Sequence, residues 1–319
     1  MLIIVEGPDC AGKSSLIEEL RRRIERRSAN DVVHVLKCGP PVGHPLDEYV
    51  VPLLGYRPND QINANHHVIC DRFHWGEAVY PTVFKRDTLL DGGQWRYIES
   101  FLLSRGAFVV HLTASPEVLE RRLRHRGDNL VDVSQLRVIR GGFYAIMHNT
   151  LLPHMVAEII DDNLPDNVIQ HAEIYARAAA PLNRYTTYVG PSLPHRLLLG
   201  DVRGPAFQGG DPINQIRPAF MPYNAMSGGY LWRALADAPF EYFRDYGIGV
   251  ANACDVDNAD ELYATLGRTQ VTTLGVNSYR CFKGMATQVP HPQWVRRFHH
   301  KRIDDYREQL LYGRPVAWN

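Results

Sequence analysis

The first half of the chain alternates short apolar runs with longer stretches in which apolar residues recur every three or four positions. The short runs are typical of buried strands, and the longer pattern is typical of amphipathic helices. Strands are expected at residues 2–5, 32–36, 67–70, 108–112 and 167–170, and helices at residues 13–27, 118–126, 136–160 and 173–180. Strands that alternate with helices predict a parallel sheet, so we expect an α/β domain over residues 1–180.

The pattern breaks at residues 181–195, which carry three prolines and a glycine and show no period. Such a segment is typical of a linker. Further on, strands are expected at residues 196–199, 248–251 and 271–274, with helices at residues 231–236 and near the end of the chain. We therefore expect a second, smaller α/β domain over residues 196–319.

Composition excludes several classes of protein. Hydrophobic residues make up 45% of the 319 residues and charged residues 22%, as in soluble globular proteins. Lys plus Arg and Asp plus Glu both number 35, which excludes a basic surface over the whole chain but not a local basic patch. No apolar run reaches the roughly eighteen residues of a membrane span, and the first residues lack the charged region of a signal peptide.

The cysteines indicate the compartment. Five of them are spread along the chain without a CxxC pair. An odd number without close spacing argues against a disulfide framework, a zinc site or an iron–sulfur cluster. We therefore expect a protein of the reducing cytoplasm (the host cytoplasm if the protein is viral).

The segment from Gly7 to Ser14, GPDCAGKS, satisfies the pattern G-x-x-x-x-G-K-[ST] between an expected strand and an expected helix. Its glycines let backbone N–H groups surround an anion, and the helix N-terminus adds a favourable field. Lys13 would reach the β- and γ-phosphates of ATP, and the Ser14 hydroxyl would help to hold Mg²⁺. The expected ATP-binding residues are Gly7, Asp9, Cys10, Ala11, Gly12, Lys13, Ser14 and Ser15.

A second polar group stands directly after the third expected strand, where ligands of an open α/β sheet bind. Asp71 could hold the metal together with Ser14, or accept a proton. Arg72 could clamp a second phosphate through two hydrogen bonds. The expected cofactors are therefore ATP and Mg²⁺.

Residues 6–9 and 14–16, the Asp71-Arg72-Phe73 run and residues 112–122 resemble the thymidylate kinase family of nucleoside-monophosphate kinases. The resemblance implies a P-loop kinase fold over residues 1–180. It also implies that Asp9 lies near the sugar of the acceptor and that Arg72 holds the acceptor phosphate. An arginine-rich lid closes over the phosphoryl group in that family, and residues 121–128 are similar to it.

Some members of the family carry an arginine inside the P-loop, where this chain has Cys10 and Ala11. The resemblance then implies that the lid supplies the cation that neutralises the transition state, with Arg124 and Arg126 as candidates. The expected catalytic residues are Lys13, Asp71, Arg72, Arg124 and Arg126.

The acceptor pocket departs from the family pattern after Arg72. Phe73, Trp75 and Tyr80 could stack on a pyrimidine or belong to the core, and Glu77 could bind a hydroxyl or an amide edge. With Asp9 and Arg72 they form the expected acceptor site, and they leave the base open, including a 5-substituted pyrimidine. Residues 39–60 lack periodicity and could form a flap over the acceptor.

In the second half, residues 199–205, 227–235, 248–253, 271–277 and 290–294 resemble, in order and spacing, the uracil-DNA glycosylase superfamily. The resemblance implies a water-orienting role for Asp201 or the loop 201–205, recognition of a pyrimidine edge by Asn252, and stabilisation of a departing base anion by His291. Residues 202–205 depart from the superfamily pattern. An active glycosylase, a module that binds a base or DNA, and a purely structural domain therefore stay open. Residues 296–302 are basic and could contact a DNA backbone or form a solvated helix face.

Three functions fit these motifs. The first is ATP- and Mg²⁺-dependent phosphoryl transfer to a deoxypyrimidine nucleotide, either dTMP or a 5-modified analogue. The second is a kinase that phosphorylates 5-hydroxymethylpyrimidines in DNA, as in virus-encoded DNA hypermodification, with the second domain recognising the base. The third is a DNA glycosylase or DNA-binding protein with a regulatory P-loop. The expected partners are a nucleotide and, in the alternatives, DNA; a membrane is not expected, and a homodimer is left open.

Overall fold

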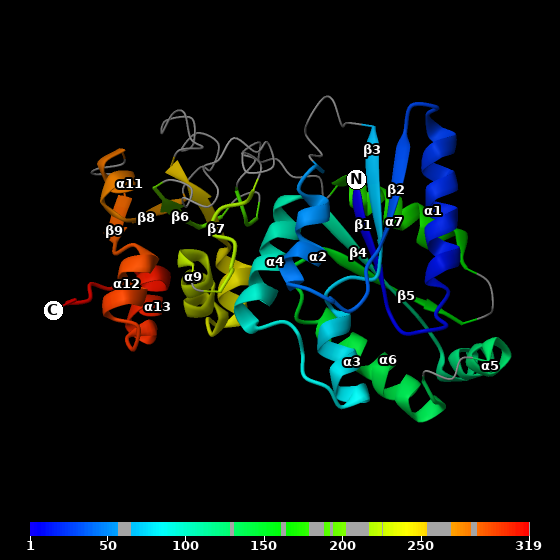
Figure 1. The fold of residues 1–319 in the computed structure, drawn as a ribbon. Helices are drawn as coiled ribbons and strands as arrows, with labels where there is room; N and C mark the ends of the chain where they lie inside the picture. The colour runs from blue at the N-terminus through cyan, green and yellow to red at the C-terminus, as the bar shows by residue number, and fades with distance from the viewer. Residues whose placement is uncertain are drawn as a thin grey trace. The chain divides into compact units, whose positions relative to one another are not determined.

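The computed structural model (Figure 1) describes residues 1–56, 65–127, 131–160, 164–178, 188–191, 194–201, 217–224, 226–253, 269–281 and 286–318. The chain divides into two compact units. Unit 1 comprises Met1–Leu90 and Arg105–Ala180, and unit 2 comprises Asp91–Ser104 and Pro181–Asn319. Each unit contains a parallel sheet with helices, so the expected α/β class is confirmed.

Unit 1 is built on a five-stranded parallel sheet in the order β2-β3-β1-β4-β5. Its strands are β1 (Leu2–Glu6), β2 (Val32–Lys37), β3 (His66–Asp71), β4 (Ala107–Ala114) and β5 (His154–Ile159). Its helices are α1 (Lys13–Arg27), α2 (Pro45–Tyr49), the 3₁₀-helix η1 (Val51–Leu53), α3 (Gly76–Phe84), α5 (Pro116–Arg126), α6 (Val133–Met147) and α7 (Asp166–Ala178).

The central strands β1 and β4 are buried along their whole length. Helices α1 and α7 lie together against β1, and α6 lies with α3 and contacts β4 (Figure 1). Strands covered on both faces can be apolar throughout, which explains the uninterrupted Leu-Ile-Ile-Val run of β1. The sheet is parallel, so the carboxyl ends of β1 and β3 point to the same edge, where the P-loop and the Asp71-Arg72 turn follow them.

The expected strand at residues 167–170 is wrong, because these residues begin helix α7. Val168, Ala172 and Ala176 are buried four residues apart, which is a helical repeat. The fifth strand is instead β5, inside the segment expected to continue a helix to residue 160. β5 lies at the sheet edge, and only its alternate residues Ala157 and Ile159 are buried, so its short pattern carries little apolar signal.

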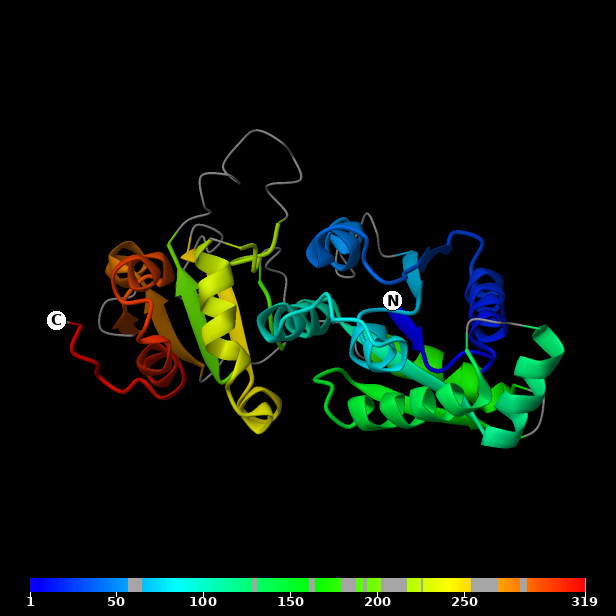
Figure 2. The same cartoon turned by 60° about the horizontal axis from the view of Figure 1, so that its bottom comes forward.

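Unit 2 contains a four-stranded parallel sheet in the order β7-β6-β8-β9. Its strands are β6 (Arg196–Gly200), β7 (Ile248–Asn252), β8 (Gln270–Leu274) and β9 (Ala286–Val289). Its helices are α4 (Gly92–Ser104), α9 (Ser227–Ala236), the π-helix η4 (Tyr242–Tyr246), α11 (Val276–Cys281), α12 (Pro292–Phe298) and α13 (Ile303–Tyr312). Figure 2 shows the same elements from a second direction.

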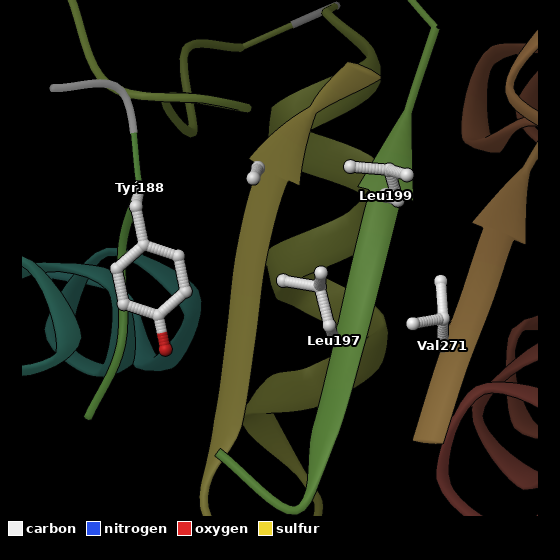
Figure 3. Packing of buried hydrophobic residues seen from close by; sticks show 5 residues of the cluster. Tyr188, Leu197, Leu199 and Val271 are labelled. Carbon is white, nitrogen blue, oxygen red and sulfur yellow. The ribbon is translucent and has the colours of Figure 1, made fainter. Parts of the chain in front are cut away.

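One hydrophobic cluster of unit 2 includes a residue from the expected linker. Tyr188 is buried against Leu197, Leu199, Ala251 and Val271 (Figure 3). The next residue forms an antiparallel bridge to β7. This part of the segment at residues 181–195 is therefore packed into unit 2, and residues 181–187 lie outside the described part of the chain.

Helix α4 belongs to unit 2 although it lies between α3 and β4 in the sequence. Its Gly93 packs directly on the backbone of Trp232 in α9, where a Cβ atom would be 3.0 Å from the Trp232 carbonyl oxygen. The ring of Tyr97 contacts that of Trp232 edge-on at 5.2 Å. In the described part of the chain no helix is both long and apolar enough to cross a membrane.

Candidate functional site

The P-loop connects the end of β1 to the start of α1. Gly7 has a φ of 141° and Gly12 a φ of 97°, conformations that favour glycine. A Cβ atom on Gly7 would lie 2.0 Å from the Leu112 carbonyl oxygen, so a side chain cannot fit there. The N-cap residue of α1 is Gly12, which has no side chain to cap the helix, so its first amide groups are available to an anion.

Lys13 is buried under this loop, with 6% of its surface exposed. Its Nζ donates to the carbonyl oxygens of Gly7 at 2.8 Å and Pro8 at 2.7 Å. Burial, followed by the nearby positive charge of Arg72, lowers the pKa of Lys13 to about 8. The Lys13 side chain is therefore held beside the P-loop. A negative charge there would favour its protonated form and raise its pKa.

Arg72 follows β3 and has a φ of 68°, which is unusual for a residue with a side chain. Its guanidinium donates to Asp9 in the P-loop and, at 2.8 Å, to the hydroxyl of Tyr80 in α3. The Tyr80 hydroxyl in turn donates to Asp9 at 3.0 Å. Burial tends to raise the pKa of Asp9, but Arg72 and Lys13 outweigh it and hold that pKa below its usual value. The P-loop, the β3 turn and α3 thus meet in one polar cluster.

Glu6, at the end of β1, connects the P-loop to the turn after β3 through hydrogen bonds, a role that was not expected from the sequence. Its fully buried carboxylate accepts from the N–H of Gly7 at 3.0 Å and from the N–H of Phe73 at 2.8 Å. Burial raises its pKa, although Lys13 and both N–H donors oppose the shift. A charged residue at the end of an otherwise apolar strand was the signal that could have identified it.

These residues surround a cavity of about 530 Å³. Its lining residues are Asp9, Cys10, Gly12, Lys13, Ser14, Ser15, Asp71, Arg72, Arg122, Arg126, Ile159 and Leu164. The cavity therefore brings together most of the expected ATP-binding residues and four of the five expected catalytic residues.

The exception is Arg124, which does not line the cavity. Its side chain is 73% exposed and donates to Glu120 at 2.6 Å along α5. Arg122, which belongs to the expected lid segment but was not selected as a catalytic cation, does line the cavity and donates to the Cys10 carbonyl oxygen at 3.1 Å. Residues four apart share a helix face, so Arg122 and Arg126 point the same way and Arg124 points elsewhere. The last residue of the expected lid, Asp128, lies outside the described residues.

Three expected acceptor residues lie away from the cavity, and a fourth, Tyr80, only contacts its lining residues Asp9 and Arg72. Phe73 and Trp75 are buried and pack with Tyr49 and His74, with the Tyr49 and Phe73 rings 5.1 Å apart. Glu77 is also buried and accepts from the Arg86 guanidinium at 2.9 and 2.6 Å. None of these three, nor Tyr80, lines the cavity. The two aromatic residues follow the core alternative, because burying their rings gains more free energy than exposing them.

The donor set of the cavity suits magnesium. Ser14 and Asp71 contribute a hydroxyl and a carboxylate, and Mg²⁺ takes oxygen ligands, commonly one or two carboxylates completed by phosphates and water. Within the described ranges no group of three or more His, Cys, Asp or Glu side chains could hold a metal ion without such help.

In unit 2, the expected pocket residues stand at the carboxyl ends of three strands. Asp201 follows β6, Asn252 ends β7, and His291 follows β9. Asp201 accepts from the N–H of Ser278. The His291 ring lies 6.1 Å from that of Phe220. The topology therefore places all three at one edge of the sheet, while loop residues 202–205 lie outside the described part of the chain.

His291 also has a structural role, and Asn252 is closely packed. His291 caps α12, since its Nδ1 accepts from the N–H of Gln293 at 3.3 Å. Burial lowers the pKa of His291, and the charge of Asp201 opposes that shift. Asn252 is buried close to Gly200, where a Cβ atom would lie 3.0 Å from its Oδ1 and 2.4 Å from the Phe220 ring.

The chain is 32% identical over 152 residues to YorR, an uncharacterized SPbeta prophage-derived protein of Bacillus subtilis strain 168. The match covers 46% of this chain and 82% of YorR. The chain belongs to the family of YorR. It matches no protein-family model.

Two solved structures are also similar. One is the YorR protein from Bacillus subtilis in complex with phosphorylated GDP, with 25% identity, 56% of this chain and 96% of that chain covered, and a TM-score of 0.41. The other is deoxyadenosine kinase from M. mycoides with bound dCTP, with 15% identity, coverage of 56% and 100%, and a TM-score of 0.34.

Proposed function

We propose that this protein is an ATP- and Mg²⁺-dependent kinase that transfers a phosphoryl group to a deoxypyrimidine nucleotide, dTMP or a 5-modified analogue. The observation that carries the proposal is the cavity in unit 1. One wall is a P-loop with its lysine, a second is the Asp71-Arg72 turn, and a third is a helix that presents two arginines. These are the parts that phosphoryl transfer needs, namely phosphate binding, metal ligands and cations at the transferred group.

In this proposal the amides at the start of α1 and Lys13 bind the β- and γ-phosphates, and Ile159 and Leu164 provide an apolar wall for the nucleobase. Ser14 and Asp71 would hold Mg²⁺, which when bound neutralises charge on the phosphate oxygens. Arg126 keeps the role expected of it, and Arg122 takes the role expected of Arg124. Negative charge spreads over the transferred oxygens during the reaction, and cations already in place stabilise it.

Arg72 is proposed to bind the acceptor, with Asp9 near its sugar, as the resemblance to thymidylate kinases implies. Arg72 lines the cavity and donates to Asp9 of the P-loop and to Tyr80 of α3, which supports this role. The nucleotide complex described for YorR, a member of the same family, also supports a nucleotide ligand.

A second candidate is a kinase acting on 5-hydroxymethylpyrimidines in DNA. It is favoured by unit 2, whose Asp201, Asn252 and His291 share one sheet edge and offer polar groups for a pyrimidine. In this case unit 2 would hold the base that unit 1 phosphorylates. A cytoplasmic location and a homodimer stay predictions.

The test is incubation with γ-labelled ATP and either free deoxynucleoside monophosphates or DNA that contains 5-hydroxymethyluracil. Label on the mononucleotide supports the first candidate, and label on DNA alone supports the second. If neither is labelled and abasic sites form, the protein is a glycosylase whose P-loop is regulatory. Lys13→Ala should abolish transfer, whereas the exposed Arg22→Ala, on the same helix, should not change it.

A further inference from the structure

Residues 290–303 form a basic segment in a chain without net charge. They contain Arg296, Arg297, Lys301, Arg302 and three histidines but no acidic residue. In the structure they make up α12 and the turn that leads into α13. The proposed phosphoryl transfer leaves this segment without a role.

Two aromatic side chains on α12 are open to solvent. Phe298 is 66% exposed and Trp294 is 39% exposed. They lie one helical turn apart, with ring centroids separated by 5.9 Å. The Trp294 ring also packs against the rings of His299 and Trp318, with centroid distances of 4.6 and 6.1 Å. Phe298 is the most exposed ring of this group. Such exposure of neighbouring aromatic rings is characteristic of a binding surface.

Two cationic residues, Arg297 and Lys301, lie within three residues of Phe298 in the sequence. The two carboxylates at the start of α13 are engaged, since Asp305 accepts from Arg302 at 2.7 Å and Asp304 from Arg307 at 3.0 Å. Among the described residues no carboxylate lies within ion-pair distance of Arg297 or Lys301, both of which are exposed. We call Trp294, Arg297, Phe298 and Lys301 the α12 surface.

We propose that the α12 surface binds single-stranded nucleic acid, with bases stacked on Phe298 and Trp294 and phosphates bound by Arg297 and Lys301. Aromatic platforms flanked by cations match the chemistry of a single strand, whose bases have open faces and whose backbone is negatively charged. A duplex covers the faces of its bases and could engage only the cations.

The position of the surface gives this binding a use. His291, the N-cap residue of α12, stands at the carboxyl edge of the sheet, which also carries Asp201 and Asn252. In the proposal, a strand that continues past the N-terminus of α12 reaches the edge where a base would be recognised. The inference extends the DNA alternative of the proposed function, and its test needs neither ATP nor phosphoryl transfer.

The experiment measures binding of the full chain to a fluorescein-labelled oligothymidylate of about fifteen nucleotides by fluorescence anisotropy, since comparable proteins contact roughly 4–16 nucleotides. Phe298→Ala should weaken binding about tenfold and Phe298→Tyr should restore it, because the tyrosine keeps the ring. Phe298 is exposed, so the fold should tolerate both substitutions. Circular dichroism of each variant checks this. Tyr175→Ala, at a 50% exposed aromatic residue of α7, is the matched control and should bind as the wild type does.

The charged residues have a separate readout. Replacing Arg297 and Lys301 together by alanine should reduce the slope of log K against log salt by about 1.4, because each phosphate contact to a single strand contributes roughly 0.7. Arg22→Ala, at an exposed arginine of α1, should leave the slope unchanged.

Three outcomes would overturn the inference. One is equal affinity for Phe298→Ala and the wild type, which would leave only a charged patch. Another is equal affinity for a duplex and a single strand. The third is no binding at all by a preparation that transfers phosphate normally, which would remove the nucleic-acid surface while leaving the proposed kinase function intact.

Discussion

At the scale of single residues, the site depends on which side chains the P-loop and its neighbours bring to one cavity. Lys13, Asp71 and Arg72 line it together with Arg122 and Arg126, while Arg124 does not. The difference between these arginines is one of helical phase rather than of residue type. Two variants two positions apart therefore distinguish the assignment.

Arg122→Ala should lower kcat for phosphoryl transfer about 100-fold, because a preorganised cation at the transferred group is lost. Arg124→Ala should change kcat less than twofold, since this side chain is solvated and pairs with Glu120. Steady-state kinetics with saturating ATP measure both. The assignment of Arg122 is wrong if the two variants behave alike.

The proposed role of Lys13 predicts that nucleotide binding depends on pH. The pKa of Lys13 is about 8 in the free protein, and a bound triphosphate should keep the side chain protonated. At pH 8 binding should then take up about half a proton, at pH 6 almost none, and affinity should fall as the pH rises above 8. Calorimetry in buffers of different ionisation enthalpy measures the uptake. Lys13→Arg, which stays charged throughout, should show no uptake linked to this site.

At the scale of elements, β4 carries an unusual buried histidine. His111 is fully buried between the sheet and α6, where its ring contacts Phe143 and Tyr144. Neither ring nitrogen has a hydrogen-bond partner among the described residues. Burial, reinforced by His154 and Lys13, lowers the pKa of His111 to about 4. The packing of β4 on α6 thus requires a neutral imidazole.

The consequence is a loss of stability in acid. The pKa of His111 is about 4 in the folded chain and 6.5 in the unfolded chain, so the unfolded state binds the extra proton between these values. The free energy of unfolding should fall as the pH drops from 6.5 to 4, by up to about 3 kcal/mol from this residue. His111→Phe should flatten this part of the profile relative to the wild type, measured by urea unfolding. The exposed His171→Ala on α7 should leave the profile unchanged.

At the scale of the whole molecule, helix α4 shows that the order of elements in the sequence differs from their grouping in space. It interrupts unit 1 in the sequence but packs on α9 in unit 2. Its Tyr97, Ile98, Phe101 and Leu102 are all buried. A boundary drawn in the sequence at residue 180 would leave this apolar face uncovered.

A chain truncated after residue 180 should therefore expose α4, bind a hydrophobic dye such as ANS and self-associate. In the full chain, Trp232→Ala should lower the free energy of unfolding by about 3–5 kcal/mol, because the buried indole that covers α4 is lost. Dye fluorescence, light scattering and thermal melts measure these effects. Dye-free, monomeric behaviour of the truncated chain would show that residues 1–180 fold independently of the rest.

The sequence alone determined the parts whose physical cause is local. Gly7, Gly12 and Lys13 have fixed spacing because the backbone must turn around an anion within a few residues, and apolar runs such as that of β1 identify central strands. Tertiary structure decided the rest. The exposed edge strand β5 has little apolar signal, and α4 finds its partner about 130 residues away in the chain. Arg122 rather than Arg124 reaches the P-loop, and Glu6 connects the P-loop to the turn after β3. Both facts depend on distances between segments that are far apart in the sequence, and the pattern of residues within one segment does not contain such distances.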